Sequence, residues 1–240
     1  MYSQPAAANY YSPPAQQQKQ RGYRICDQCG AVETPATRFR LCGGCMITQY
    51  CSQECQKIHW LGHKPICQHT RAEKEKVSAS YALSPDENIV KNLRKFTSAH
   101  TAILGWAGFQ ALQLKRVPSN IRQSALLIQL TPRNHPQSHC RFSITSTHIV
   151  NPRKHIRDPL VLNDIREREE RCRRNGGIGT LVIILQCNDI SQVMPVEVDP
   201  PSKITWDTRE DWLEVLHHFV DSGRTDFKPI STTQRGVYYG

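Results

Sequence analysis

The fold of this chain is decided by four short pieces of sequence: Cys26-Asp-Gln-Cys29, Cys42-Gly-Gly-Cys45, Cys51-Ser-Gln-Glu-Cys55 and His63-Lys-Pro-Ile-Cys67. They hold eight side chains of the kinds that bind zinc, the number that two tetrahedral zinc ions require. A Cys-x2-Cys pair is typical of a zinc knuckle, and a pair with x3 spacing lies on one face of a helix, one turn apart. We therefore expect two zinc sites, each built from one knuckle and one helical pair.

The spacing leaves open which knuckle serves which helical pair, because a sequential and an interleaved assignment both give four ligands per ion. The order of the ligands and the run from Cys55 to Cys67 resemble the MYND-type zinc finger. Tyr50 before the fifth ligand, Gln56 after the sixth and Trp60 three residues before the histidine also match that family. The long loop between the second and third ligands departs from its pattern.

The resemblance implies an interleaved arrangement, the cross-brace. Its two sites would be Cys26, Cys29, Cys51 and Cys55 for site one, and Cys42, Cys45, His63 and Cys67 for site two. His59 lies four residues after Cys55 and could compete for a metal, but the family has no ligand at that position. The cofactors are then two Zn²⁺ ions with a structural role.

The alternative for ten cysteines is a secreted disulfide framework, which requires an oxidising compartment. The N-terminal residues have neither the basic nor the apolar region of a signal peptide. No run of residues approaches the length of a membrane span. We therefore predict zinc rather than disulfides, and a protein that is not secreted, sits in no membrane and resides in the nucleus or the cytoplasm.

The balance of charge is basic, with a formal net charge of +10. Seven zinc-bound thiolates and two zinc ions would lower it to about +7, since zinc binds the thiolate. Such a charge permits weak binding of nucleic acid. The most basic run, residues 166–174, however, also contains acidic residues, and the pairs Glu167 with Arg171 and Glu169 with Arg173 stand at i,i+4. This pattern predicts a solvated helix rather than a phosphate-binding surface.

We expect a small cross-brace double-zinc finger followed by an α+β domain, with a disordered N-terminal tail. The expected parts are residues 1–22 (disordered tail), 23–68 (finger), 69–83 (linker), 84–223 (α+β domain) and 224–240 (poorly ordered C-terminal tail). Within the domain, the expected elements are a helical region from Ser84 to 114, strands 124–130 and 140–150, a charged helix 163–175, strands 178–187 and 193–198, and a last helix capped by Asp207.

No catalytic residue is predicted. Residues 176–179, Gly-Gly-Ile-Gly, follow a helix and open a strand, the reverse of a nucleotide-binding loop. MYND fingers also occur in SET-domain lysine methyltransferases, whose cofactor site uses an Asn-His pair like the one within residues 133–140, but no other SET motif accompanies it. Cys140, Cys172 and Cys187 are widely separated and lack the x2 spacing of metal ligands. Cys172, in an expected helix, and Cys187, in an apolar strand, are interpreted as buried apolar residues.

The function that these observations favour is that of a zinc-dependent protein-interaction protein without enzymatic activity. The resemblance implies binding of short proline-rich peptides, with Gln56 and Trp60 at the positions that match the family's groove. An aromatic ring can pack on proline while an amide bonds the peptide backbone. Three alternatives remain: Trp60 only covers the second zinc site, residues 84–223 hold an unrecognised enzyme that the finger targets, or the chain binds nucleic acid weakly.

Overall fold

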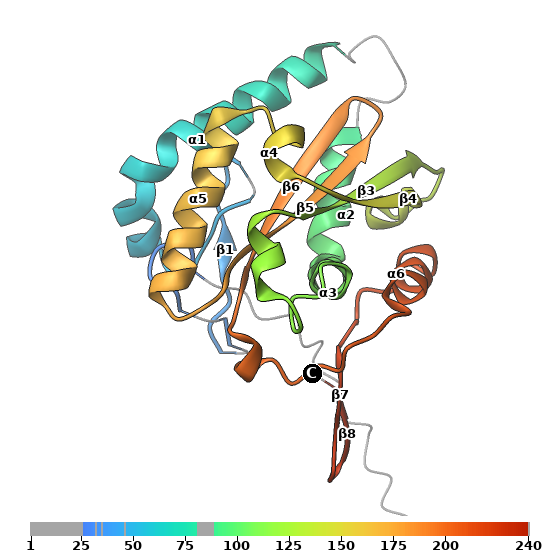
Figure 1. Cartoon of the computed structure of the whole chain (residues 1–240). Coiled ribbons are helices and arrows are strands. Elements are labelled where there is room, and N and C mark those ends of the chain that lie inside the picture. The colour runs from blue at the N-terminus through green and yellow to red at the C-terminus, as the bar shows by residue number, and fades with distance from the viewer. Residues whose placement is uncertain (1–25, 32, 35, 46, 81–88, 240) are drawn as a thin grey trace, which may run out of the picture.

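The protein is described here by a computed structural model, which covers residues 26–31, 33–34, 36–45, 47–80 and 89–239. The expected N-terminal tail and the expected helix start at Ser84 lie outside these residues. The described chain forms a central β-sheet with helices on both faces and a small finger at one side (Figure 1). The order of helices and strands agrees with the finger and α+β domain expected from the sequence.

The central sheet has four strands in the order β4-β3-β5-β6. Their bounds are β3 Ala125–Pro132, β4 Phe142–Val150, β5 Gly179–Cys187 and β6 Ile190–Val198. The two central strands, β3 and β5, are parallel, and both outer pairs are antiparallel. A parallel pair needs a crossover, which contains the short helix α4 (Pro152–His155) and the long helix α5 (Pro159–Arg174).

Both faces of the central strands are buried, which explains their continuous apolar sequences. On one face they pack against α2 (Ile89–Ala99), α3 (Thr101–Ala111) and α6 (Trp212–Asp221). The contact with α3 is close, since a Cβ added at Gly108 would meet Leu181 and Ile183 at 3.1 Å. On the other face the strands pack against α5. Residues 89–239 therefore form three layers around a mixed sheet, and we call this part, expected as the α+β domain, the α/β domain below.

The finger consists of β1 (Arg40–Leu41), β2 (Gln49–Tyr50) and the helix α1 (Gln53–Ser80). Among the described residues of the finger, the buried apolar core consists of Phe39, Tyr50 and cysteine side chains. The expected linker from residue 69 onward continues the helix of the finger as far as Ser80. A unit with so small a core depends on metal for its stability.

The C-terminal part differs from the sequence-based expectations. Helix α6 begins at Trp212 after Asp211, not after Asp207. The carboxylate of Asp207 instead accepts hydrogen bonds from the backbone N (2.9 Å) and Oγ1 (2.7 Å) of Thr232. These bonds anchor a hairpin of β7 (Ile230–Thr233) and β8 (Gly236–Tyr239) in the segment where we expected a poorly ordered tail.

Short 3-10 helices complete the domain at Pro118–Arg122, Ser138–Cys140 and Pro201–Lys203. None of the helices within the described ranges is both long enough and apolar enough to cross a membrane.

A buried histidine at the start of α3 predicts a pH-dependent stability. His100 is 1% exposed, its Nε2 lies 3.2 Å from the carbonyl oxygen of His139, and its Nδ1 has no hydrogen-bond partner in the described part of the chain. Burial lowers the pKa of His100 to about 4. In the unfolded chain the His100 ring takes up a proton near its ordinary pKa of about 6.5, whereas in the folded chain it stays neutral at pH 5. Protonation of the unfolded state should therefore lower the free energy of unfolding by about 2 kcal/mol between pH 8 and pH 5.

The measurement is chemical denaturation at both pH values for the wild type, His100→Gln and the exposed-residue control His155→Gln. We expect the pH-dependent loss to be smaller by about that amount in His100→Gln alone. An identical loss in all three proteins would contradict the assignment.

Candidate metal centre

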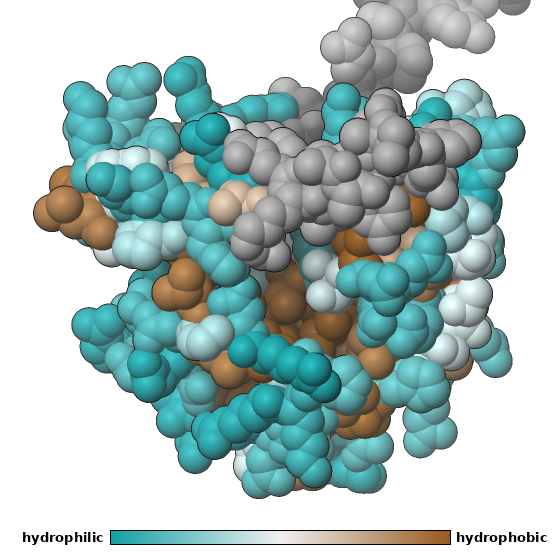
Figure 2. Space-filling model, turned by 90° about the horizontal axis from the view of Figure 1, so that it is seen from above, coloured by the Kyte–Doolittle hydropathy of each residue, from teal (hydrophilic) through white to brown (hydrophobic). Residues whose placement is uncertain are grey.

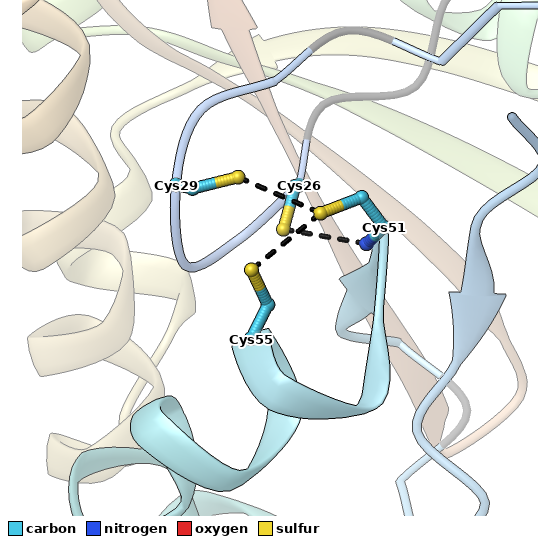
Figure 3. Close-up of side chains that lie close together, drawn as sticks. All are labelled: Cys26, Cys29, Cys51 and Cys55. Carbon is cyan, nitrogen blue, oxygen red and sulfur yellow. Dashed lines mark hydrogen bonds between the residues drawn. The ribbon is translucent and has the colours of Figure 1, made fainter.

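The first cluster joins the knuckle of Cys26 and Cys29 to the start of α1, where Cys51 and Cys55 lie (Figure 3). All four sulfur atoms lie within 4.8 Å of one another. The Sγ of Cys51 lies 3.6 Å from that of Cys29 and 3.5 Å from that of Cys55. Four sulfurs at about 2.3 Å from a zinc ion are about 3.8 Å apart, so the cluster has the size of a tetrahedral zinc site.

The second cluster joins the knuckle of Cys42 and Cys45 to His63 and Cys67 on α1, and all four residues are buried. The Sγ atoms of Cys42 and Cys67 are 3.7 Å apart, and Nε2 of His63 lies 3.6 Å from Sγ of Cys45. The two clusters are therefore interleaved along the chain, as the cross-brace implies. Each offers one full set of four zinc ligands.

Thr48 fixes the orientation of the histidine ligand. Its buried Oγ1 lies 3.3 Å from Nδ1 of His63, while Nε2 of the same ring faces the sulfur atoms. A hydroxyl that accepts a hydrogen bond from Nδ1 holds the tautomer whose Nε2 is free to bind zinc. Sequence analysis did not identify Thr48, because a threonine three residues after a cysteine is no signal by itself.

His59 lies outside both clusters. Its Nδ1 is 3.0 Å from the hydroxyl of Tyr50, and its ring stacks on that of His63 at a centroid distance of 5.6 Å. The ring of His59 therefore packs against a ligand without being one, in agreement with the expectation that His63 is the histidine ligand.

The pKa values of the thiols in the second cluster indicate that a bound cation is needed to keep all of them ionised. Burial raises the pKa of the Cys45 thiol, but hydrogen bonds from His63, Thr48 and the backbone outweigh it and lower the pKa to about 6. Burial and the neighbouring thiols raise the pKa of Cys67 to about 12. Thiolates this close repel one another, so all of them can ionise together only when a zinc ion supplies the compensating charge.

The first knuckle also carries a buried carboxylate, Asp27, which is 4% exposed. One oxygen accepts a hydrogen bond from the backbone N of Gln49 at 2.7 Å. The other forms ion pairs with Arg168 and, at 3.3 Å, with Arg171, both on α5. Arg171 also donates to the carbonyl oxygen of Asp27 at 2.8 Å and to Glu197 on β6. The finger is thereby bonded to the α/β domain.

This network corrects part of the sequence interpretation of α5. The pair of Arg173 with Glu169 exists as expected. The expected partner of Arg171, Glu167, instead accepts a hydrogen bond from Asn163, because the finger covers the side of α5 from which Arg171 projects. Arginines three residues apart, facing an acidic residue inside a knuckle, are the only sequence signal of this contact.

Two interleaved clusters with four protein ligands each define a cross-brace double zinc finger. The family model described as "MYND finger" matches residues 26–67. These residues are a MYND finger, a zinc-binding protein-interaction domain, which confirms the resemblance stated from the sequence.

Curated relatives share this segment. The chain is 41% identical over 51 residues to the MYND-type zinc finger protein samB of Aspergillus clavatus, a match that covers 20% of this chain and 8% of that protein. It is 43% identical over 49 residues to an F-box protein of Arabidopsis thaliana, with 19% of this chain and 13% of that protein covered. The chain thus matches only a small part of each relative's length. No solved structure matches the chain.

The two clusters predict a zinc content that single substitutions reduce stepwise. Native mass spectrometry should find two zinc ions in the wild type, one in Cys51→Ala and one in Cys45→Ala, because each variant opens a different tetrahedron. Cys140→Ala is the control, since Cys140 is buried outside both clusters, and it should keep two ions. Disulfides among the seven clustered cysteines, or a folded finger without zinc, would contradict the assignment.

The Asp27 network predicts that the finger and the α/β domain stabilise each other. Asp27→Asn removes the anion that both arginines share, but Arg168 keeps Asp164 and Arg171 keeps Glu197. The loss should therefore be about 1.5–3 kcal/mol, the range for hydrogen bonds to charged groups. Urea denaturation with zinc present in excess measures this loss. Glu169→Gln is the matched control, because it breaks a more exposed pair on the same helix and should cost less than about 1 kcal/mol. Equal losses in the two variants would refute the prediction.

Proposed function

We propose that the finger binds short proline-rich peptides on the face of α1 that carries Gln56 and Trp60, and that both zinc ions are structural. The observation that supports this most directly is the state of Trp60. Its ring meets the ring of His63 edge to face at a centroid distance of 6.1 Å, yet the residue remains 38% exposed.

The exposure of Trp60 weighs against the alternative that it only covers the second zinc site. Tyr50, which does fill the interior of the finger, is 2% exposed. A tryptophan that rests on a rigid metal site but keeps a large part of its ring in water is suited to pack against proline. Gln56 lies one turn earlier on the same face of α1 and offers an amide for the peptide backbone.

The closed ligand sets support a structural role for the metal. Each cluster supplies four protein ligands, so a tetrahedral zinc ion there has no open position for water or substrate. Catalytic zinc sites keep such a position. The zinc ions therefore hold the finger together and do not carry out a reaction.

We propose no enzymatic activity for the α/β domain. The stretch from Arg133 to Cys140, which was compared with a methyltransferase site, is engaged in local bonds. The guanidinium of Arg133 donates to the carbonyl oxygen of Val220 at 3.1 Å, and Nδ1 of His135 accepts from the backbone N of Gln137 at 3.1 Å. Arg133 thus holds the loop against α6, and His135 bonds within the loop itself.

A nucleic-acid partner has little support in the charges of α5. Arg168 and Arg171, in the middle of the basic run, point into the contact with the finger and pair with carboxylates. These two arginines are therefore not available to contact a phosphate backbone. Arg173 on the same helix is also paired, with Glu169. Partners with proline-rich segments fit the molecule better.

A peptide array tests the proposal, with the full zinc-loaded chain as the probe. We expect selective capture of proline-rich peptides, and at least about tenfold weaker binding for Trp60→Ala, because truncating an aromatic anchor typically costs about 2 kcal/mol or more. Gln56→Ala should weaken binding less. Peptides in which alanine replaces proline should not be retained.

The control is Leu61→Gln, which changes an exposed residue on another side of α1 and should leave proline-peptide binding intact. Failure of a folded, zinc-loaded chain to capture any proline-rich peptide would refute the proposal. Undiminished capture by Trp60→Ala would refute the role of that residue.

A further inference from the structure

Helix α1 carries a second exposed apolar face, distinct from the one with Trp60. Ile58 and Leu61 are 67% and 87% exposed, and Gly62 and Pro65 are exposed as well. We call these four residues the apolar stripe. They stand at i, i+3, i+4 and i+7, the spacing of a helix face that packs against a partner. Neither Ile58 nor Leu61 belongs to an apolar cluster of the described residues.

The stripe points away from Gln56 and Trp60. A helix turns by about 100° per residue, which places Ile58 and Pro65 nearly opposite these two residues. His69, one turn after Pro65 on the same side of α1, contacts Asp158 at the start of α5, so the stripe ends where the helix meets the domain. In Figure 2 a group of apolar side chains projects at the left edge, the side on which Figure 1 places the first turns of α1.

Gly62 gives the stripe a notch. A Cβ added at this position would have no atom within 4 Å, so the space above the helix backbone is open. Ile58, Leu61 and Pro65 surround the notch. A side chain of a partner helix can enter such a hole between neighbouring residues, in the way that knobs fill holes between packed helices.

We propose that the apolar stripe binds an acidic amphipathic helix of a partner protein. The apolar spacing fits the recognition of one helix by another. Two lysines beside the stripe favour an acidic partner. Lys57 and Lys64 are exposed and lie on the helix between the stripe and the face of Trp60. Acidic residues beside the apolar face of the partner would meet these two lysines.

The same charges disfavour a second copy of this chain as the occupant. Two copies that met through their stripes would bring the lysines of both toward one interface, and the chain as a whole has a formal net charge of +10. Like charges across an interface cost free energy. The stripe is also short, which places the contact among small interfaces that dissociate readily.

Fluorescence anisotropy with three synthetic helical peptides tests this proposal on the full zinc-loaded chain. The first has leucines at i, i+3, i+4 and i+7 with glutamate flanks, the second has the same leucines with lysine flanks, and the third is a scrambled acidic peptide. We expect the first to bind at least tenfold more tightly than the other two. Its affinity should fall with added salt.

Variants locate the site. The double variant Ile58→Gln, Leu61→Gln should bind the acidic helix at least tenfold more weakly, Leu61→Met should retain binding, and Lys57→Gln with Lys64→Gln should weaken it and reduce its salt dependence. Trp60→Ala should leave this binding unchanged, which separates it from the proline-peptide proposal.

Three results would overturn the proposal. The first is equal binding of the acidic helix and either control peptide, or no binding below about 1 mM, the limit of weak specific association. The second is loss of binding in Trp60→Ala, which would assign the helix to the other face. The third is a wild-type dimer in sedimentation that the double variant abolishes, which would make a second copy the occupant.

Discussion

Bonds between thiolates and zinc take the place of a hydrophobic core in the first part of this chain. Among its described residues the finger buries Phe39, Tyr50 and five of its eight ligands, which is too little apolar surface for independent stability. Two tetrahedra therefore fix how the knuckles meet the first turns of α1. The eight ligands therefore also fix the positions of the exposed residues of the finger. These include Gln56, Trp60 and the apolar stripe.

The metal also sets the relation between the finger and the rest of the molecule. Asp27 stands between two ligands of site one, and its backbone and carboxylate both bond to arginines of α5. Arg171 also donates a hydrogen bond to Glu197 on β6, at the edge of the sheet. The knuckle thus holds Asp27 in the orientation in which it pairs with the two arginines. These ion pairs in turn hold the finger in place against α5. Helix α1, which carries both proposed binding faces, is held against the domain by this contact and by His69 with Asp158.

The sequence predicted what depends on local patterns and missed what depends on distant pairing. Ligand spacing identified all eight clustered residues, although the interleaving came from the resemblance, because spacing alone satisfies two assignments. Apolar runs located β3 and β5, but nothing local indicates that they pair in parallel. The bond of Asp27 to Arg171 joins residues 144 positions apart, and such contacts leave no periodic trace. The sequence predicts a helix cap at Asp207, because an aspartate that precedes a helix has the same local pattern as one that anchors a distant hairpin.

The Asp27 network has a consequence for the evolution of the chain. Arg168 is 11% exposed and pairs with Asp164 as well as Asp27, and Arg171 is 18% exposed and pairs with Glu197 as well as Asp27. Asp27 is the carboxylate that the finger contributes to this poorly hydrated network. A substitution at Asp27 therefore alters the contact of the finger with α5 as well as the knuckle itself. A finger of the same family with a neutral residue in place of Asp27 could still bind zinc through its own eight ligands, but it would bring no carboxylate to Arg168 and Arg171. One residue between two zinc ligands thus has a second task, because it matches this finger to the domain beside it.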